Sequence, residues 1–263
     1  MKIVRIMTVV LAALLLSACA PRQIVKPIPA DTPPEKVLDM AMARDQGLQG
    51  IRAMVKVVVR VDGAGSQSFD AVLYAKRPDR VRLTGLALMG YAVFDIVIRG
   101  DKFYFYDPSE GFLYTGPRGS LPPFLEGRGV KADPDVIFGS LFFQTPGEGG
   151  RYFLDATAEG YDLYITRDRE GMLVPVSRTV YDAGLTERMR VFYDGLARPY
   201  LYVETPGYTT VDGYSLPASL RIKDTKNGYA AEVTFEKYLV NPDGLDGDFT
   251  IEGGEFKGLR EVE

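Results

Sequence analysis

The chain has 263 residues, of which 31 are basic and 35 are acidic, and its formal net charge is −4. This charge argues against nucleic acid as a partner, because neutralising phosphates requires a basic surface. The sequence contains no His, which excludes Ser-His-Asp and Cys-His catalysis and His-ligated zinc. We therefore expect a protein that is not an enzyme and that uses neither a cofactor nor a metal.

The first residues have the pattern of a secretory signal. Lys2 and Arg5 precede an apolar run over residues 6–16, and small residues then lead to Cys19. The run is shorter than the roughly 20 residues that a membrane-spanning helix needs. The segment Leu16-Ser17-Ala18-Cys19 resembles the bacterial lipobox, in which the Cys is acylated. The chain has a single Cys, so this residue cannot form an internal disulfide.

We therefore predict a signal peptide over residues 1–18 and a lipid anchor on Cys19. An ordinary signal peptide with an incidental Cys is the alternative. Several acyl chains on one residue hold a protein firmly to a bilayer, whereas a single chain holds it only marginally. Ala20 follows the Cys. In the enterobacterial sorting pattern that this site resembles, such a residue favours the outer membrane over the inner membrane.

Residues 19–34 are predicted to be a lipidated linker, and residues 35–263 to be one β domain. The linker contains five Pro residues, which make a chain extended and semi-rigid. A helix is expected over residues 35–49. Its apolar residues form a narrow stripe, and Gly47 and Gly50 end it.

From Ile51 the apolar period changes from that of a helix to two, which predicts half-buried strands. Gly- and Pro-containing turns separate these strands, as in an antiparallel meander. The strands expected in this first run cover residues 51–61, 68–76, 80–86, 91–99, 102–106 and 111–115.

Residues 116–132 lose the strand pattern, and a second short helix is expected over residues 133–143. Strands then resume, and the residues after Val240 are expected to form a loop. The second run of strands covers residues 152–156, 161–166, 173–181, 188–193, 200–204, 218–223 and 230–238.

These elements predict a mainly β (α+β) fold with one large antiparallel sheet of about 11 strands. A sheet of that size is expected to curl. We expect an open half-barrel with an apolar cavity and with short helices that cover its concave side. A closed barrel or sandwich with a packed interior is the alternative.

The order of lipobox, helix, strand meander, central helix and second meander resembles the LolA/LolB superfamily of lipoprotein carriers and receptors. The membrane-anchored LolB branch is the most similar. Residues 48–53 resemble the helix exit into the first strand, residues 82–90 a strand with a protruding loop, and residues 216–224 with 231–238 the closing hairpin. The chain is longer than a typical LolB and has no Trp, which favours a divergent relative.

The resemblance implies a lipoprotein of the outer membrane that faces the periplasm and binds acyl chains of lipoproteins, or other lipids, in the half-barrel. A periplasmic carrier protein is then an expected partner. The alternative function is a structural or assembly lipoprotein that uses the same fold as a protein-interaction platform. The candidate cavity residues are Val55, Val57, Val59, Leu73, Phe94, Ile96, Phe103 and Phe105, with Ile137, Leu141 and Phe142 as a lid. An ordinary core position is the alternative for each of them.

An apolar run, residues 86–91, lies between two predicted strands, although loops usually face water. If this loop is exposed, Leu86, Leu88 and Met89 could contact a bilayer or receive a lipid. If it folds inward, they belong to the core. The acidic residues Asp243, Asp246, Asp248 and Glu252 do not have the spacing of a calcium loop, and a solvated turn is the preferred interpretation.

Overall fold

The computed structural model describes residues 28–29, 32–61, 63, 65–127, 134–143, 150–251 and 256–262. The predicted signal peptide, Cys19 and most of the predicted linker therefore lie outside the described residues. In these described ranges, no helix has the length and apolar character needed to cross a membrane.

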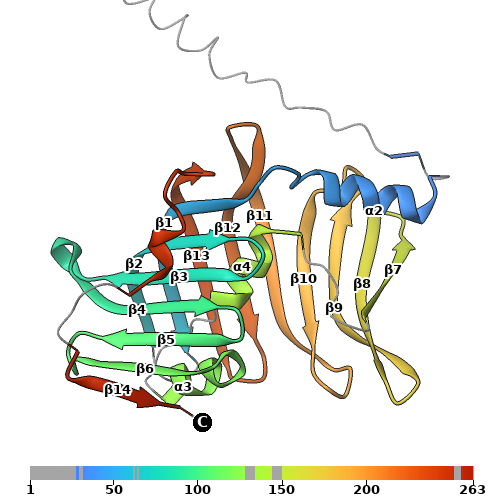
Figure 1. Ribbon diagram of the computed structural model, residues 1–263. Coiled ribbons are helices and arrows are strands. Elements are labelled where there is room, and N and C mark those ends of the chain that lie inside the picture. The colour runs from blue at the N-terminus through green and yellow to red at the C-terminus, as the bar shows by residue number, and fades with distance from the viewer. Residues whose placement is uncertain are drawn as a thin grey trace, which may run out of the picture.

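The described residues form one curled sheet of 14 strands that does not close into a barrel (Figure 1). The first strands along the chain are β1 (Gly50–Val61), β2 (Gly65–Lys76), β3 (Arg80–Leu86), β4 (Ala92–Arg99), β5 (Lys102–Asp107) and β6 (Phe112–Pro117). They are followed by β7 (Gly150–Ala156), β8 (Gly160–Arg169), β9 (Met172–Asp182), β10 (Glu187–Tyr193), β11 (Pro199–Val211), β12 (Tyr214–Asp224), β13 (Tyr229–Val240) and β14 (Gly258–Glu261).

The sheet consists of two meanders joined at their first and last strands. Its order is β14-β6-β5-β4-β3-β2-β1-β13-β12-β11-β10-β9-β8-β7. We call β1–β6 with β14 the first half and β7–β13 the second half. The two halves meet where β1 pairs antiparallel with β13, with Val57 opposite Val233. The only parallel pair among the described strands is β14 with β6.

The helices lie mainly in the connections outside the two meanders. The helical elements are α2 (Pro34–Ala43), α3 (Leu121–Gly127), α4 (Pro134–Leu141) and the short 3₁₀ turns η1 (Leu88–Gly90), η2 (Arg118–Ser120) and η3 (Gly247–Phe249). The chain must pass from β6, near one edge, to β7 at the other edge. The connection that contains α3 and α4 therefore crosses a face of the sheet.

Side chains of alternating exposure place the main core on that face. From Ile51 to Val59 in β1 the odd-numbered residues are buried, and the even-numbered ones between them are mostly exposed. The buried side chains of both halves pack together with residues of α3 and α4 in one cluster. A smaller cluster holds α2 against β8 and β9 through Val37, Tyr161 and Tyr181.

The structure corrects three expectations. The described residues form fourteen strands and not about eleven, because all thirteen segments with a strand pattern form strands and the tail that was expected to be a loop adds β14. This strand has four residues and no apolar alternation, and it forms by pairing with β6. A helix, α3, occupies part of the segment 116–132 that carried no pattern. Helix α2 ends at Ala43, before the predicted end at residue 49.

Candidate functional site

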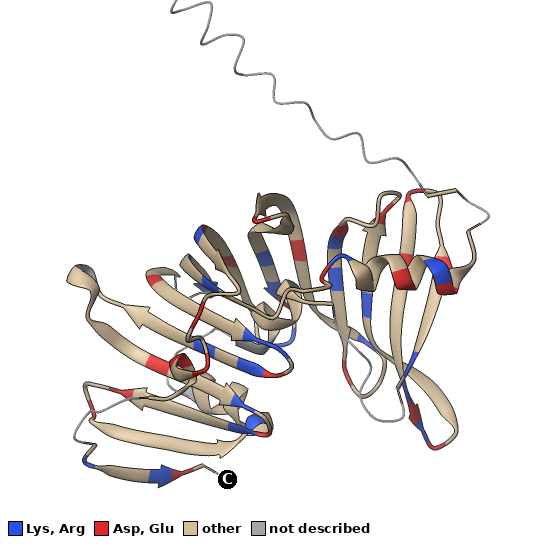
Figure 2. Ribbon diagram, turned by 45° about the horizontal axis from the view of Figure 1, so that its top comes forward, with Lys and Arg blue, Asp and Glu red and all other residues tan. Residues whose placement is uncertain are grey.

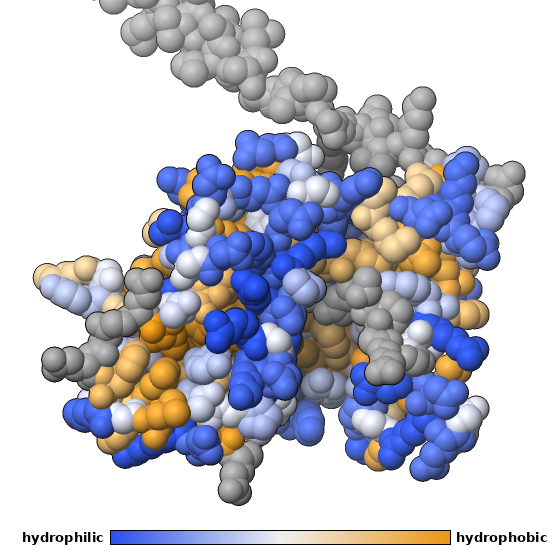
Figure 3. All heavy atoms as spheres, viewed as in Figure 1, coloured by the Kyte–Doolittle hydropathy of each residue, from blue (hydrophilic) through white to orange (hydrophobic). Residues whose placement is uncertain are grey.

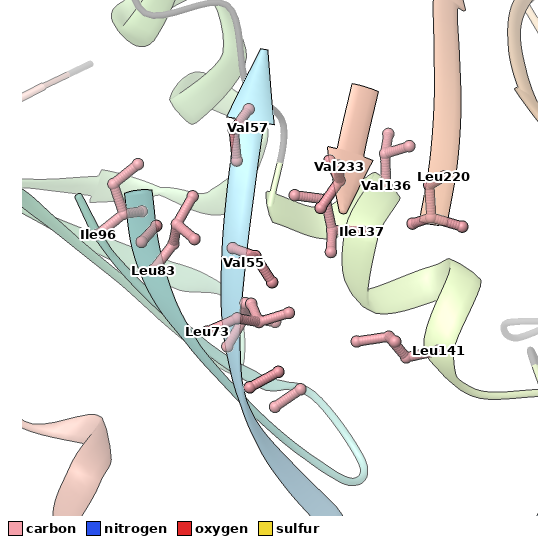
Figure 4. Close-up of a cluster of buried hydrophobic side chains, with 14 of the residues drawn as sticks. Val55, Val57, Leu73, Leu83, Ile96, Val136, Ile137, Leu141, Leu220 and Val233 are labelled. Atoms are coloured by element: carbon pink, nitrogen blue, oxygen red, sulfur yellow. The ribbon is translucent and has the colours of Figure 1, made fainter. Parts of the chain in front are cut away.

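The predicted cavity residues lie together, but they form a packed core. All eleven belong to the main cluster, and none of them has more than 9% of its surface exposed. Figure 4 shows Val55, Leu73 and Ile96 pointing from the strands toward Ile137 and Leu141 of α4. Their role as contacts for cargo stays a prediction.

Aromatic rings fill the end of this core that lies under α3. The ring of Phe124, on α3, lies 5.5 Å from that of Phe103 and 5.3 Å from that of Phe105. Phe105 also stacks against Phe94, at 6.5 Å between ring centroids. Contacts of this kind make a dense interior. The described part of the first half therefore resembles an ordinary core more than an empty cavity.

A pocket of about 600 Å³ lies beside this core, between α4 and the second half of the sheet. Its volume is within the range of small-molecule sites in proteins. Figure 3 shows apolar residues in the hollow between the two parts of the molecule. The residues that line the pocket are Arg77, Pro78, Arg118, Val136, Phe138, Gly139, Phe142, Phe143, Gly150, Ile165, Thr166, Arg167, Val176, Ser177, Phe192, Tyr200 and Leu201.

Several apolar residues of the pocket are only half-buried. Ile165 on β8, Val176 on β9 and Phe192 on β10 all have intermediate exposure, as do Phe138 and Phe143 beside them. Apolar surface in contact with water costs free energy, about 25 cal/mol for each Å². An apolar ligand that covered these side chains would recover that free energy. The sequence placed Ile165, Val176 and Phe192 on strands but gave no signal that they share a pocket with α4.

Of the predicted cavity residues, Phe142 alone lines this pocket. The Arg77 guanidinium lies over the Phe142 ring, 5.1 Å from its centroid. The same guanidinium donates a 2.9 Å hydrogen bond to Asp45, whose carboxylate also accepts the backbone N–H of Phe143. These contacts join the β2–β3 turn to the residues at the end of α4.

A buried ion pair lies behind the pocket. Arg190, which is 2% exposed, donates a 2.5 Å hydrogen bond to Glu187, and it also donates to the backbone oxygen of Gly139 on α4. Tyr208 donates a 2.8 Å hydrogen bond to the backbone oxygen of Glu187. Burial raises the pKa of Glu187, and the nearby positive charge of Arg190 opposes this effect. The pair fixes α4 against β10 and so holds one wall of the pocket.

The predicted apolar loop is exposed at η1, which protrudes between β3 and β4 (Figure 1). Met89 is 90% exposed, Tyr91 is 72% exposed and Val93 is 44% exposed. Met89 also has a backbone φ of 76°, a conformation that is uncommon for residues other than Gly. Leu86 has intermediate exposure, and the side chain of Leu88 lies outside the described part of the chain.

The acidic residues of the tail contact basic residues of the sheet. Asp246 accepts hydrogen bonds from Lys76, at 2.6 Å, and from Arg80, at 2.8 Å. Arg82 donates to the backbone oxygen of Asp248 at 2.8 Å. These contacts place the tail over β2 and β3. In the described ranges, no group of three or more His, Cys, Asp or Glu residues could hold a metal ion.

Comparison with known proteins identifies the fold. No protein-family model matches the sequence, and no curated protein matches it significantly. A solved structure of a DUF1329 family protein from Desulfovibrio piger aligns with a TM-score of 0.61 and 13% identity, over 84% of this chain and 98% of that protein. A domain from Vibrio parahaemolyticus, described as an outer membrane lipoprotein-sorting protein domain, has a TM-score of 0.59 and 13% identity, over 81% and 94%.

A LolA superfamily protein from Nitrosomonas europaea aligns with a TM-score of 0.54 and 9% identity, over 81% of this chain and 96% of that protein. At such identities the likeness concerns the fold. The chain therefore has the LolA/LolB-like fold, and the fold predicted from the resemblance is confirmed.

Proposed function

We propose that this protein is a non-enzymatic lipoprotein that binds acyl chains, either of other lipoproteins or of free lipids, at the outer membrane. Lipid on Cys19 would anchor it, and residues 19–34 would separate the anchor from the β domain. A fixed receptor needs such an anchor, whereas a shuttle between membranes does not. A periplasmic carrier protein is the proposed donor of cargo.

The pocket of about 600 Å³ is the observation that carries this proposal. Each CH₂ group that leaves water contributes about 0.8 kcal/mol, so an apolar pocket binds an acyl chain without directional chemistry. The half-buried side chains of Ile165, Val176 and Phe192 supply the apolar surface. The packed core of the first half would hold the shape of the sheet, while the pocket beside α4 would hold the ligand.

Native mass spectrometry of the full chain, extracted from a bacterial membrane fraction in mild detergent, tests the proposal. We expect co-purifying acyl lipid or lipopeptide. Ile165→Trp should reduce the bound fraction about tenfold, because the larger ring occupies the pocket and excludes several CH₂ groups. Leu196→Trp is the control, since Leu196 is 70% exposed and outside the pocket. Absence of bound lipid, or recovery of the chain without membrane attachment, would contradict the proposal.

The exposed loop at η1 is the proposed contact with a membrane or with incoming lipid. Met89→Glu places a charge on a side chain that is 90% exposed, so folding should be unchanged within about 0.5 kcal/mol. We expect slower transfer of a fluorescent acyl lipid from the protein to vesicles. Leu196→Glu, at an exposed turn of the second half, is the matched control. Equal transfer rates for the two variants would show that the loop has no special part in transfer.

A further inference from the structure

Three arginines from distant parts of the sequence line the pocket beside α4. Arg77 follows β2, Arg118 lies in η2 and Arg167 lies on β8. No acidic side chain is found among the described residues that line the pocket. Figure 2 shows basic residues on both halves of the sheet where the two halves face each other. The described lining therefore has three basic residues and no acidic one, although the chain as a whole has a net charge of −4, and Asp45, outside the lining, pairs with one of the three, Arg77.

The surrounding structure holds two of these arginines in place. Arg77 is oriented by its 2.9 Å ion pair with Asp45 and by the Phe142 ring. Arg118 donates a 3.3 Å hydrogen bond to the backbone oxygen of Gly100. An arginine that is already oriented loses less conformational freedom when it binds an anion. Arg167, by contrast, is exposed.

Apolar side chains and arginines thus share one pocket, and a second pocket of the molecule differs from it. That pocket, of about 500 Å³, includes Glu204 and Glu232 together with its basic residues. Its three basic residues are therefore largely offset by these two acidic residues of the same lining. The described lining of the pocket beside α4 combines apolar residues with three arginines and has no acidic residue.

We propose that the pocket beside α4 binds an anionic amphiphile, with an acyl chain on the apolar side chains and a phosphate headgroup at the arginines. This inference rests on the proposed function and narrows its ligand class. Arginine is well suited to phosphate, because its planar guanidinium makes two parallel hydrogen bonds to phosphate oxygens. The acylated Cys of a lipoprotein carries no phosphate, so an acidic phospholipid fits the pocket better.

Native mass spectrometry of the full chain in nonionic detergent tests the headgroup preference separately from the acyl-binding function. The probes are phosphatidylglycerol and phosphatidylcholine with identical acyl chains, which differ in net charge. We expect phosphatidylglycerol to occupy the pocket about tenfold more at equal concentration, as one charge-assisted hydrogen bond would allow. Equal binding of the two lipids would overturn the headgroup inference and leave the acyl-binding function intact. Binding of neither lipid would overturn both.

Variants locate the effect at the arginines. Arg167→Ala should lower the preference for phosphatidylglycerol about threefold or more. It should weaken the binding of phosphatidylcholine less, because the choline cation of that lipid offsets the charge of its phosphate. Arg198→Ala is the control, because Arg198 lies outside the pocket at an exposed turn of the same half and pairs with Asp194. Arg77→Gln keeps a polar side chain at the β2–β3 turn and provides a second test if it folds normally by circular dichroism. An unchanged preference in both pocket variants would overturn the inference.

Glycerol 3-phosphate distinguishes a lipid headgroup from a free phosphate ester. We expect it to compete with phosphatidylglycerol only at concentrations about a hundredfold higher, since it lacks the acyl chains that supply most of the binding free energy. Competition at equal concentrations would identify a site for small phosphate esters and would overturn the proposal of an amphiphile.

Discussion

Glu187→Ala is expected to lower the free energy of unfolding by about 3–5 kcal/mol, the cost of leaving a buried charge without its partner. Arg190 is 2% exposed, and its side chain contacts Glu187 at 2.5 Å. Its remaining contact, with the backbone oxygen of Gly139, supplies no negative charge. The Nε atom of Arg190 and the Oε1 atom of Glu187 have no hydrogen-bond partner in the described structure. No further hydrogen bond at these atoms would therefore compensate for the loss of the ion pair.

The measurement is chemical unfolding of the full chain in detergent, followed by circular dichroism. The double variant Glu187→Leu with Arg190→Met removes both charges, and we expect it to recover most of the loss, because apolar residues can replace a buried pair. Arg198→Ala, which breaks the exposed pair with Asp194, should cost less than about 1 kcal/mol. A double variant as unstable as the single one would contradict an uncompensated charge as the cause.

This ion pair also bears on function, because it connects α4 to β10. If α4 loosens, the pocket loses one wall, and binding of an acyl chain should weaken even where the sheet stays folded. Both Glu187→Ala and Ile165→Trp would then lower lipid binding. Glu187→Ala would also lower the free energy of unfolding, whereas Ile165→Trp would leave it unchanged.

The first half of the sheet could be predicted from local pattern alone. The alternation in β1 places Val55 and Val57 on the buried face, and the structure confirms that face. The Gly- and Pro-containing turns predicted in this half also lie between its strands in the structure. This agreement has a simple cause, since a period of two is set by backbone geometry and does not depend on what lies opposite.

Features that depend on long-range contacts could not be predicted. Strand β14 has no alternation and exists through its pairing with β6. The pocket is built from Arg77, Arg118 and residues of β8–β11, which no sequence pattern connects. The predicted cavity residues lie in one cluster with α4, whose helix was predicted, but no pattern in residues 116–132 predicted α3, and Phe124 of α3 packs against Phe103 and Phe105.

Phe105→Ala tests whether the acyl chain binds in the packed core or in the pocket beside α4. Phe105 is 2% exposed and contacts the rings of Phe94 and Phe124. Its truncation should leave a cavity and cost about 3–5 kcal/mol in the free energy of unfolding. If the ligand lies in the pocket beside α4, native mass spectrometry should find lipid binding unchanged, at a temperature where the variant is folded.

Phe192→Ala should weaken lipid binding and cost less stability than Phe105→Ala does. Phe192 is half-buried and lines the pocket, so its truncation costs less stability than that of Phe105 but removes apolar surface from the ligand. We expect about tenfold weaker lipid binding, which corresponds to roughly 1.4 kcal/mol. If Phe105→Ala instead weakens binding and Phe192→Ala does not, the acyl chain enters the core of the first half. Helix α4 would then have to move away from the strands that it covers, and the packed core would be the closed state of the half-barrel.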